Sequence, residues 1–172
     1  DYMVTHGITA SIGHTNATSD EALEAIQNGA SCATHTYNAM KGLHHREAGT
    51  LGAVMISDNV YAELIADLIH VSKTAIKLLV KTKTVDKMIA ITDAMEAKNL
   101  KDGTYELGGQ EVYVKDGSAR LKDGTLAGSI LNLNKGLRNI KEAAGISLED
   151  TIKMAKIKPA KNLGISHFKG SI

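Results

Sequence analysis

Short apolar segments alternate with segments of helical periodicity along most of the chain. Apolar runs typical of strands are predicted at 8–13, 31–34, 61–67 and 88–92. Helices are predicted at 20–28, around 73–83, at 130–144 and at 148–157, and a polar loop at 36–50. Because strands and helices take turns, the pattern indicates parallel βα units and an α/β fold rather than a sandwich or a bundle.

Several residues at the predicted helix ends are of the kind that start and stop helices. The run Thr-Ser-Asp-Glu at 18–21 is typical of an N-cap, and Ser147 occupies the same place before the last predicted helix. Gly29 and Gly145 follow the ends of two other helices, where glycine adopts the left-handed backbone that closes a helix. These residues fix the expected helix boundaries.

The period changes between residues 102 and 124. Strand-like runs at 105–107, 111–114 and 119–121 are separated by Gly-Gly at 108–109 and Asp-Gly at 116–117. Such dipeptides favour tight turns between antiparallel strands. The sequence therefore predicts a β-hairpin insertion at about 102–124.

Composition places the chain among ordinary globular domains. Of its 172 residues, 43% are hydrophobic and 23% charged, and the formal net charge is +1, which gives no attraction toward nucleic acid or a membrane surface. A single cysteine, Cys32, cannot form an internal disulfide, and there is neither a signal-peptide pattern nor a long apolar run. We therefore expect a protein of the reducing cytoplasm.

Three residues suited to metal or proton chemistry follow predicted strands: His14, His35 and Asp93. Alone, each has an ordinary interpretation, because a single histidine at a strand end is more often a hydrogen-bonded structural residue and a single aspartate more often caps a helix. Parallel strands, however, end at one rim, where two imidazoles can bind one divalent cation and a carboxylate can transfer a proton from an activated water. Together they indicate a catalytic metal site.

Other residues near these strand ends have weaker interpretations. Cys32 lies on the opposite face of its strand from His35, so we interpret it as a small buried apolar residue rather than a ligand. His70 is placed to hydrogen-bond a substrate. The basic loop 44–46 can receive an anion but is more often solvated surface, and the backbone N–H groups of 127–129 are a weak anion site before a helix.

Six motifs in the same order resemble the N-acetylglucosamine-6-phosphate deacetylases of the amidohydrolase superfamily, and they cover nearly the whole chain. They lie at 14–17, 34–40, 44–47, 66–70, 92–95 and 126–129. The resemblance implies a partial TIM (β/α)8 barrel, roughly its second half. It also implies hydrolysis of the acetamide of N-acetylglucosamine 6-phosphate to glucosamine 6-phosphate and acetate, in amino-sugar breakdown.

The resemblance also assigns roles to individual residues. It implies that His14 and His35 bind a divalent metal, zinc or iron, and that Asp93 is the catalytic acid and base. It implies that the sugar phosphate contacts a further set of residues: Asn38, Ala39, Arg46, His70, Leu126, Ala127 and Gly128. In this family the loop around Arg46 can reach the site of a neighbouring subunit, so a homodimer is expected.

The chain departs from the family's pattern before His14. The family's metal site also takes a glutamate from an earlier strand, many members add a His-x-His pair, and a complete barrel needs roughly 250 residues. We therefore expect that the N-terminal half and most of a small β domain are absent, and that this chain alone has an incomplete metal site and little activity. Two alternatives stay open: an amidohydrolase acting on N-acyl amino acids or cyclic amides, and a non-catalytic module that binds sugar phosphates.

Overall fold

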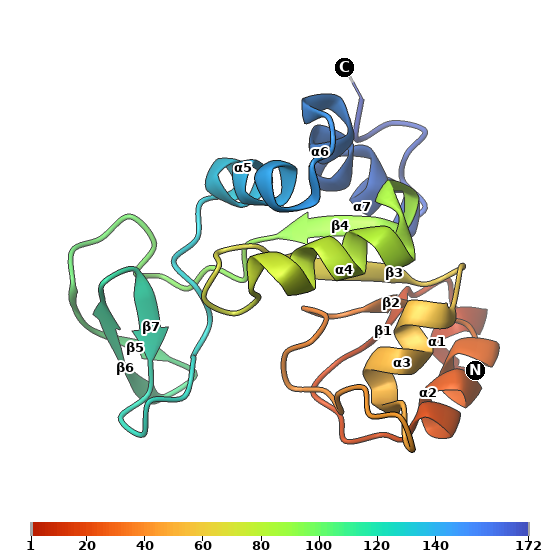
Figure 1. The fold of residues 1–172 in the computed structure, drawn as a ribbon, viewed down its shortest axis with the longest axis horizontal. Helices are drawn as coiled ribbons and strands as arrows, with labels where there is room; N and C mark the ends of the chain where they lie inside the picture. Colours follow the sequence, from red (N-terminus) through yellow and green to blue (C-terminus); the bar gives the residue numbers. More distant parts are fainter. Residues whose placement is uncertain (1, 172) are drawn as a thin grey trace.

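A four-stranded parallel sheet forms the centre of the computed structural model, which describes residues 2–171 (Figure 1). The strands lie in the order β1-β2-β3-β4, and each pairs only with its neighbours in sequence. They are β1 (Ala10–Ile12), β2 (Ala30–Ala33), β3 (Tyr61–Ile65) and β4 (Met88–Ile91). The alternation of strand and helix therefore produces the predicted parallel βα units, with β1 and β3 shorter than predicted.

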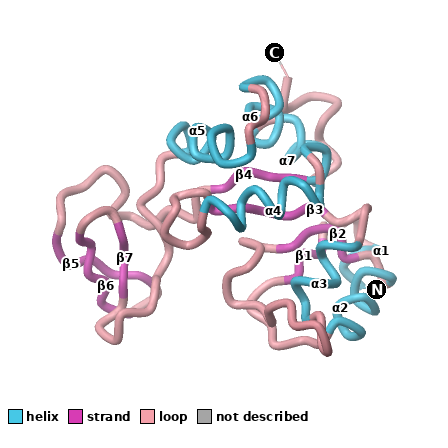
Figure 2. The backbone as a smooth tube through the Cα atoms, viewed as in Figure 1, coloured by secondary structure: helices cyan, strands magenta, loops and turns pink. Residues whose placement is uncertain are grey.

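Helices connect the strands and cover the sheet (Figure 2). Those between the strands are α2 (Ser19–Gln27), α3 (Gly49–Ile56) and α4 (Lys73–Lys83), while α5 (Leu133–Ala144) packs against α4 and β4. Their apolar faces enclose one core, in which Leu64, Ile76 and Met88 are completely buried. Each such side chain contributes about 1.5–3 kcal/mol by leaving water, so this core holds the helices in fixed positions against the strands.

Predicted helix ends are confirmed by the hydrogen bonds at the caps. The Thr18 hydroxyl accepts from the N–H of Glu21, while the Glu21 carboxylate accepts from the N–H of Thr18, which is a capping box. Ser147 caps α6 (Leu148–Ala155) through the N–H of Asp150. Gly145 ends α5 with a left-handed φ of 69°.

One helix was not predicted, because the segment after the polar loop at 36–50 has no amphipathic period. Seven of the eight residues of α3 are buried, so apolar positions lie all around it. A helix of this kind shows no contrast between a polar and an apolar face. Two short elements, α1 (Tyr2–Thr5) and the 3₁₀ turn Val85–Lys87, were also not predicted.

The helix predicted at 148–157 is interrupted. It ends at Ala155, and α7 (Ile157–Asn162) begins after Lys156, whose φ and ψ of −122° and −74° are not helical. Pro159 has no N–H to donate to the carbonyl of Ala155, and its ring would clash with the preceding turn of a continuous helix. The prediction of one helix was therefore wrong, and α5 also begins at Leu133 rather than at 130.

Three antiparallel strands form a separate small sheet, which stands apart from the helices at the left of Figure 1. They are β5 (Gly103–Leu107), β6 (Gln110–Lys115) and β7 (Ser118–Arg120). Their inner faces pack on a second core that contains Val112, Val114 and Ala119. The predicted antiparallel strands and their turns are therefore present.

No helix among residues 2–171 combines the length and the apolar character that a membrane crossing needs.

Candidate functional site

The predicted catalytic residues occupy equivalent places at the ends of their strands. His14, His35 and Asp93 each lie two residues beyond the last residue of β1, β2 and β4. Asp67 has the same place after β3. Because the four strands are parallel, these side chains all emerge at one edge of the sheet.

The backbone at three of these positions is left-handed. The φ angles are 44° at His14, 30° at His35 and 51° at Asp93. A residue with a side chain rarely adopts this conformation, and such residues cluster at active sites because the surrounding fold has to hold them there. The chain therefore turns away sharply after each strand and leaves the functional side chain at the rim.

The two histidines are neighbours. Their ring centroids lie 4.8 Å apart and their planes meet at 76°. Gly13 permits this approach, because a Cβ added at Gly13 would lie 2.7 Å from the Cβ of Thr34 on the adjacent strand. Only glycine lets the ends of β1 and β2 come this close.

We predict that Gly13→Ala destabilises the protein and separates the two histidines. The new methyl group would overlap with Thr34, so one strand end has to move, at a cost of about 1–3 kcal/mol. Urea unfolding followed by circular dichroism measures the loss. Gly42→Ala is the matched control, since a Cβ there meets no atom within 4 Å; equal stability of the two variants would contradict the prediction.

Asp93 is fixed beside another predicted binding segment. The N–H of Ser129 donates to the Asp93 carbonyl at 2.8 Å, and the N–H of Met95 donates to the Ser129 carbonyl at 2.9 Å. These bonds place Gly128, which has a left-handed φ of 64°, against the backbone of Asp93. The segment 126–128 thereby borders the site.

One pocket of about 950 Å³ brings the predicted residues together. It is lined by nine of the ten residues predicted as catalytic, metal-binding or substrate-binding: His14, His35, Asn38, Ala39, His70, Asp93, Leu126, Ala127 and Gly128. The volume is within the range of small-molecule sites. The convergence expected of the two imidazoles and the carboxylate of Asp93 is therefore present.

Arg46 is the tenth residue, and it does not line this pocket. It is exposed on the loop after β2, where its guanidinium lies 2.7 Å from Nε2 of His45 and its N–H donates to Nδ1 of His44. Hydrogen bonds of Glu47 anchor the end of this loop, because its carboxylate accepts from the N–H groups of Ser19 and Gly49. Within this chain Arg46 has no contact with the pocket.

Sequence reasoning missed several polar residues that line the pocket, among them Gln110 and Arg120. Both belong to the antiparallel sheet, and Nη1 of Arg120 donates to the carbonyl of Gly124 at 2.8 Å. Nothing in their local sequence distinguishes them from surface residues. Among the residues that line the pocket, Arg120 carries the permanent positive charge and Asp93 carries the carboxylate.

Glu63, on β3, is a further missed residue, beside His35. Its carboxylate accepts from the N–H of His35 at 3.4 Å. Burial raises the pKa of Glu63 above its ordinary value, although the hydrogen bond from His35 opposes that rise. An acidic residue inside the apolar run 61–66 was the signal that could have identified it.

The histidine pair fits part of a metal site. Nδ1 of His35 is buried and has no hydrogen-bond partner, which is costly for a polar atom unless a cation or a proton acceptor satisfies it. Two imidazoles at this spacing can both reach one cation. No group of three or more His, Cys, Asp or Glu residues suited to a metal occurs within residues 2–171, so a cation held by this pair would need further ligands.

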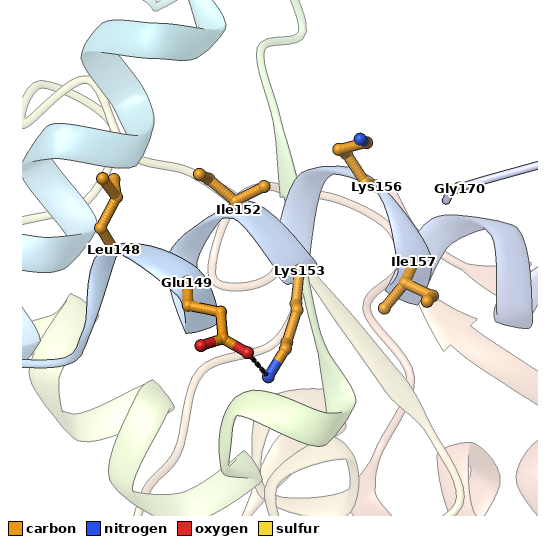
Figure 3. Close-up of a pocket in the computed structure, with 7 residues that line it drawn as sticks. All are labelled: Leu148, Glu149, Ile152, Lys153, Lys156, Ile157 and Gly170. Carbon is orange, nitrogen blue, oxygen red and sulfur yellow. Dashed lines mark ion pairs between the residues drawn. The ribbon is translucent and has the colours of Figure 1, made fainter. Parts of the chain in front are cut away.

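A second hollow lies far from these residues, on α6 and α7 (Figure 3). Its walls are mostly apolar and include Leu148, Ile152 and Ile157, with an ion pair of 2.8 Å between Glu149 and Lys153 at its border. Exposed pairs of this kind contribute little to stability. No predicted site residue lines this hollow.

The sequence is similar to those of known amidohydrolases. Residues 3–172 match the amidohydrolase family. The chain is 47% identical over 171 residues to an N-acetylglucosamine-6-phosphate deacetylase of Bacillus subtilis, which covers 99% of this chain and 43% of that protein. It is 37% identical over 171 residues to an N-acetylgalactosamine-6-phosphate deacetylase of Escherichia coli O157:H7, with 99% and 45% covered.

The fold matches as well. The crystal structure of N-acetylglucosamine-6-phosphate deacetylase from Pasteurella multocida superimposes with a TM-score of 0.95 at 40% sequence identity, and the match covers 99% of this chain and 45% of that one. The chain therefore spans less than half the length of each of these three relatives.

Proposed function

Since the chain belongs to the amidohydrolase family, we propose that it supplies the acid and base, two metal ligands and much of the substrate pocket of an N-acetylglucosamine-6-phosphate deacetylase. One observation carries this proposal: His14, His35 and Asp93 line a single pocket together with six of the seven residues predicted to bind a sugar phosphate. The relatives named above support the substrate.

We further propose that the four parallel strands are the second half of an eight-stranded barrel, with the antiparallel sheet inserted before α5. The parallel order of β1 to β4 and the site at their carboxyl ends support this interpretation. The share of the Pasteurella multocida chain that is matched, 45%, also suits half of a barrel. Further metal ligands would then come from strands of the other half of the barrel.

In this proposal His14 and His35 hold a divalent cation, zinc or iron. When bound, such a cation would act as a Lewis acid: it would polarise the acetamide carbonyl and lower the pKa of water, so that hydroxide is available as the nucleophile near neutral pH. The left-handed backbone at both residues keeps the imidazoles at the rim, and the Gly13 contact keeps them adjacent. The chain thus positions two ligands before any cation arrives.

Asp93 moves the proton in this proposal. Its side chain lies at the pocket wall, open to water, so the carboxylate can accept the proton that the attacking water loses. It then donates this proton to the nitrogen of the departing amine, which turns a poor leaving group into a neutral one. The hydrogen bonds between Asp93 and the segment 128–129 hold the backbone of Asp93 through both steps.

The remaining pocket residues orient the ligand. The carboxamides of Asn38 and Gln110 and the backbone of 126–128 offer hydrogen bonds to a sugar. Arg120 supplies a permanent positive charge for a phosphate group within this chain. Binding energy at the phosphate, far from the reacting amide, helps to fix the amide against Asp93.

Arg46 has another role in this proposal. Because it lies on an exposed loop and away from the pocket of its own chain, we place it against the ligand of a neighbouring copy. A homodimer would then bind the phosphate through Arg120 of one subunit and Arg46 of the other. The anchoring of the loop by Glu47 gives Arg46 a defined base from which to reach outward.

The test is a chimaera in which these 172 residues replace the matching 43% of the Bacillus subtilis relative. We expect metal-dependent release of acetate from N-acetylglucosamine 6-phosphate, and little release by the 172-residue chain alone. N-acetylgalactosamine 6-phosphate is assayed in parallel, since a relative is named for that epimer. Binding of the sugar phosphate without acetate release would favour a non-catalytic module, and release from N-acetyl amino acids instead would favour the other amidohydrolases.

A further inference from the structure

Asp67 and His70 form a pair of largely buried side chains, which the proposed mechanism does not use as a pair. Oδ2 of Asp67 lies 2.6 Å from Nδ1 of His70, and their side chains are only 9% and 7% exposed. Hydrogen bonds that a carboxylate accepts in such surroundings are strong and short. The pair therefore fixes the orientation of the His70 ring.

The loop that carries the pair is held on both sides. The other oxygen of Asp67, Oδ1, accepts from the N–H groups of Ile69 and His70, each at 2.8 Å. Asn139 of α5 donates to the carbonyl of Ala66 at 2.7 Å, just before the loop. Burial raises the pKa of the Asp67 carboxyl, but the hydrogen bonds from His70 and Ile69 outweigh burial and hold the pKa below its ordinary value. Asp67 is thus an acceptor on both of its oxygens.

The other ring nitrogen of His70, Nε2, has no partner among the described residues. His70 lines the pocket, and among residues 2–171 no protein atom makes a hydrogen bond to Nε2. Nε2 is also not among the side-chain atoms that are buried without a partner, so it is accessible to solvent. Nδ1 of the ring is therefore hydrogen-bonded to Asp67, and Nε2 is available to a ligand.

We infer that Asp67 is a positioning residue that keeps the proton of the neutral His70 ring on Nδ1, so that Nε2 accepts a hydrogen bond from a hydroxyl group of the bound sugar. A carboxylate can only accept, so the nitrogen that it contacts must carry the proton, and the opposite nitrogen of a neutral ring then has a free lone pair. This role in binding rests on the proposed function, whereas the tautomer follows from the contact itself.

A sugar is the ligand class that such an acceptor suits. Sugars present several hydroxyl donors, and a site that reads them needs acceptors held in place. Asp93 is assigned to proton transfer, and the carboxamides of Asn38 and Gln110 can rotate to offer either an oxygen or an NH₂ group. Nε2 of His70 differs from these groups, because its contact with Asp67 through Nδ1 fixes it as an acceptor.

The tautomer can be measured on the 172-residue chain without any ligand. Two-bond nitrogen–proton NMR correlations distinguish a ring protonated on Nδ1 from one protonated on Nε2, and His70→Gln identifies the signal. We expect the Nδ1-protonated form at a pH where the ring is neutral. In Asp67→Asn the amide oxygen can still accept from the N–H groups of Ile69 and His70, while its NH₂ group donates to Nδ1, so the proton should move to Nε2. A ring protonated on Nε2 in the unmodified chain would overturn the inference.

Binding is measured in the chimaera by calorimetry with glucosamine 6-phosphate. Asp67→Asn should weaken binding about tenfold, the equivalent of one lost hydrogen bond. Asp58→Asn removes the same charge from the turn between α3 and β3, at an exposed residue that lines neither this pocket nor the hollow beside Asp67, and should bind normally. An Asp67→Asn variant that shows the reversed tautomer and unaltered affinity would disprove the role in binding. Loss of acetate release in the unmodified chimaera would instead contradict the proposed function and leave the tautomer result standing.

Discussion

Replacing Asp93 with asparagine in the chimaera is expected to lower kcat for deacetylation by about 10²–10⁴-fold. Asparagine has nearly the same shape but can neither accept the proton of the attacking water nor return it to the amine. The backbone is not expected to change, because asparagine tolerates the left-handed φ of 51° at this position. Acetate release under saturating substrate measures the effect, and KM should change far less than kcat.

The control for this substitution is Asp58→Asn, which alters an exposed aspartate in the turn between α3 and β3. It removes the same charge from a residue that does not line the pocket, so kcat should be unchanged. Retention of more than about a tenth of the activity by Asp93→Asn would assign the proton transfer to another group.

His35→Gln is expected to weaken binding of a divalent cation by at least about 100-fold, and to abolish activity at low metal concentration. The substitution removes one of the two proposed metal ligands of this chain and leaves only His14. Loss of a residue that merely orients a metal ligand already lowers affinity by about 10–100-fold, so loss of the ligand itself should cost at least as much. Zinc bound per chain, measured by mass spectrometry after dialysis against a weak chelator, reports the loss in the chimaera.

Two further variants separate metal binding from folding. His35 is buried, so its replacement also disturbs packing, whereas His14 is exposed and His14→Gln should lose the metal with little loss of stability. His167→Gln changes an exposed histidine near the C-terminal end of the described chain and should bind metal normally. Full zinc occupancy in both His14→Gln and His35→Gln would exclude these residues as ligands.

The rim of the sheet was predictable because its signals are local. A short strand rich in small or apolar residues, with His or Asp two residues beyond its end, identifies both the element and its functional end, as at His35 and Asp93. The parallel arrangement then follows from the intervening helices. The shared pocket of His14, His35 and Asp93 is a direct consequence of that topology.

Other features depend on distances that no local pattern encodes. A motif predicted that Arg46 contacts the sugar phosphate, but only the structure shows that its anchored loop holds it away from the pocket of its own chain. Arg120 lines the pocket because of how the antiparallel sheet sits against the rim, which its own strand does not reveal. The helix α3 was missed because uniform burial removes the periodicity by which helices are recognised.

The left-handed backbone at His14, His35 and Asp93 has an evolutionary consequence. Histidine, aspartate and asparagine tolerate this conformation better than most residues, and β-branched residues are almost excluded from it. Exchange among these three types can therefore alter which cation is preferred, or remove catalysis altogether, without any rearrangement of the main chain. The backbone conformation thus restricts which substitutions the fold accepts at these positions, and the accepted residues include side chains that bind metals or transfer protons.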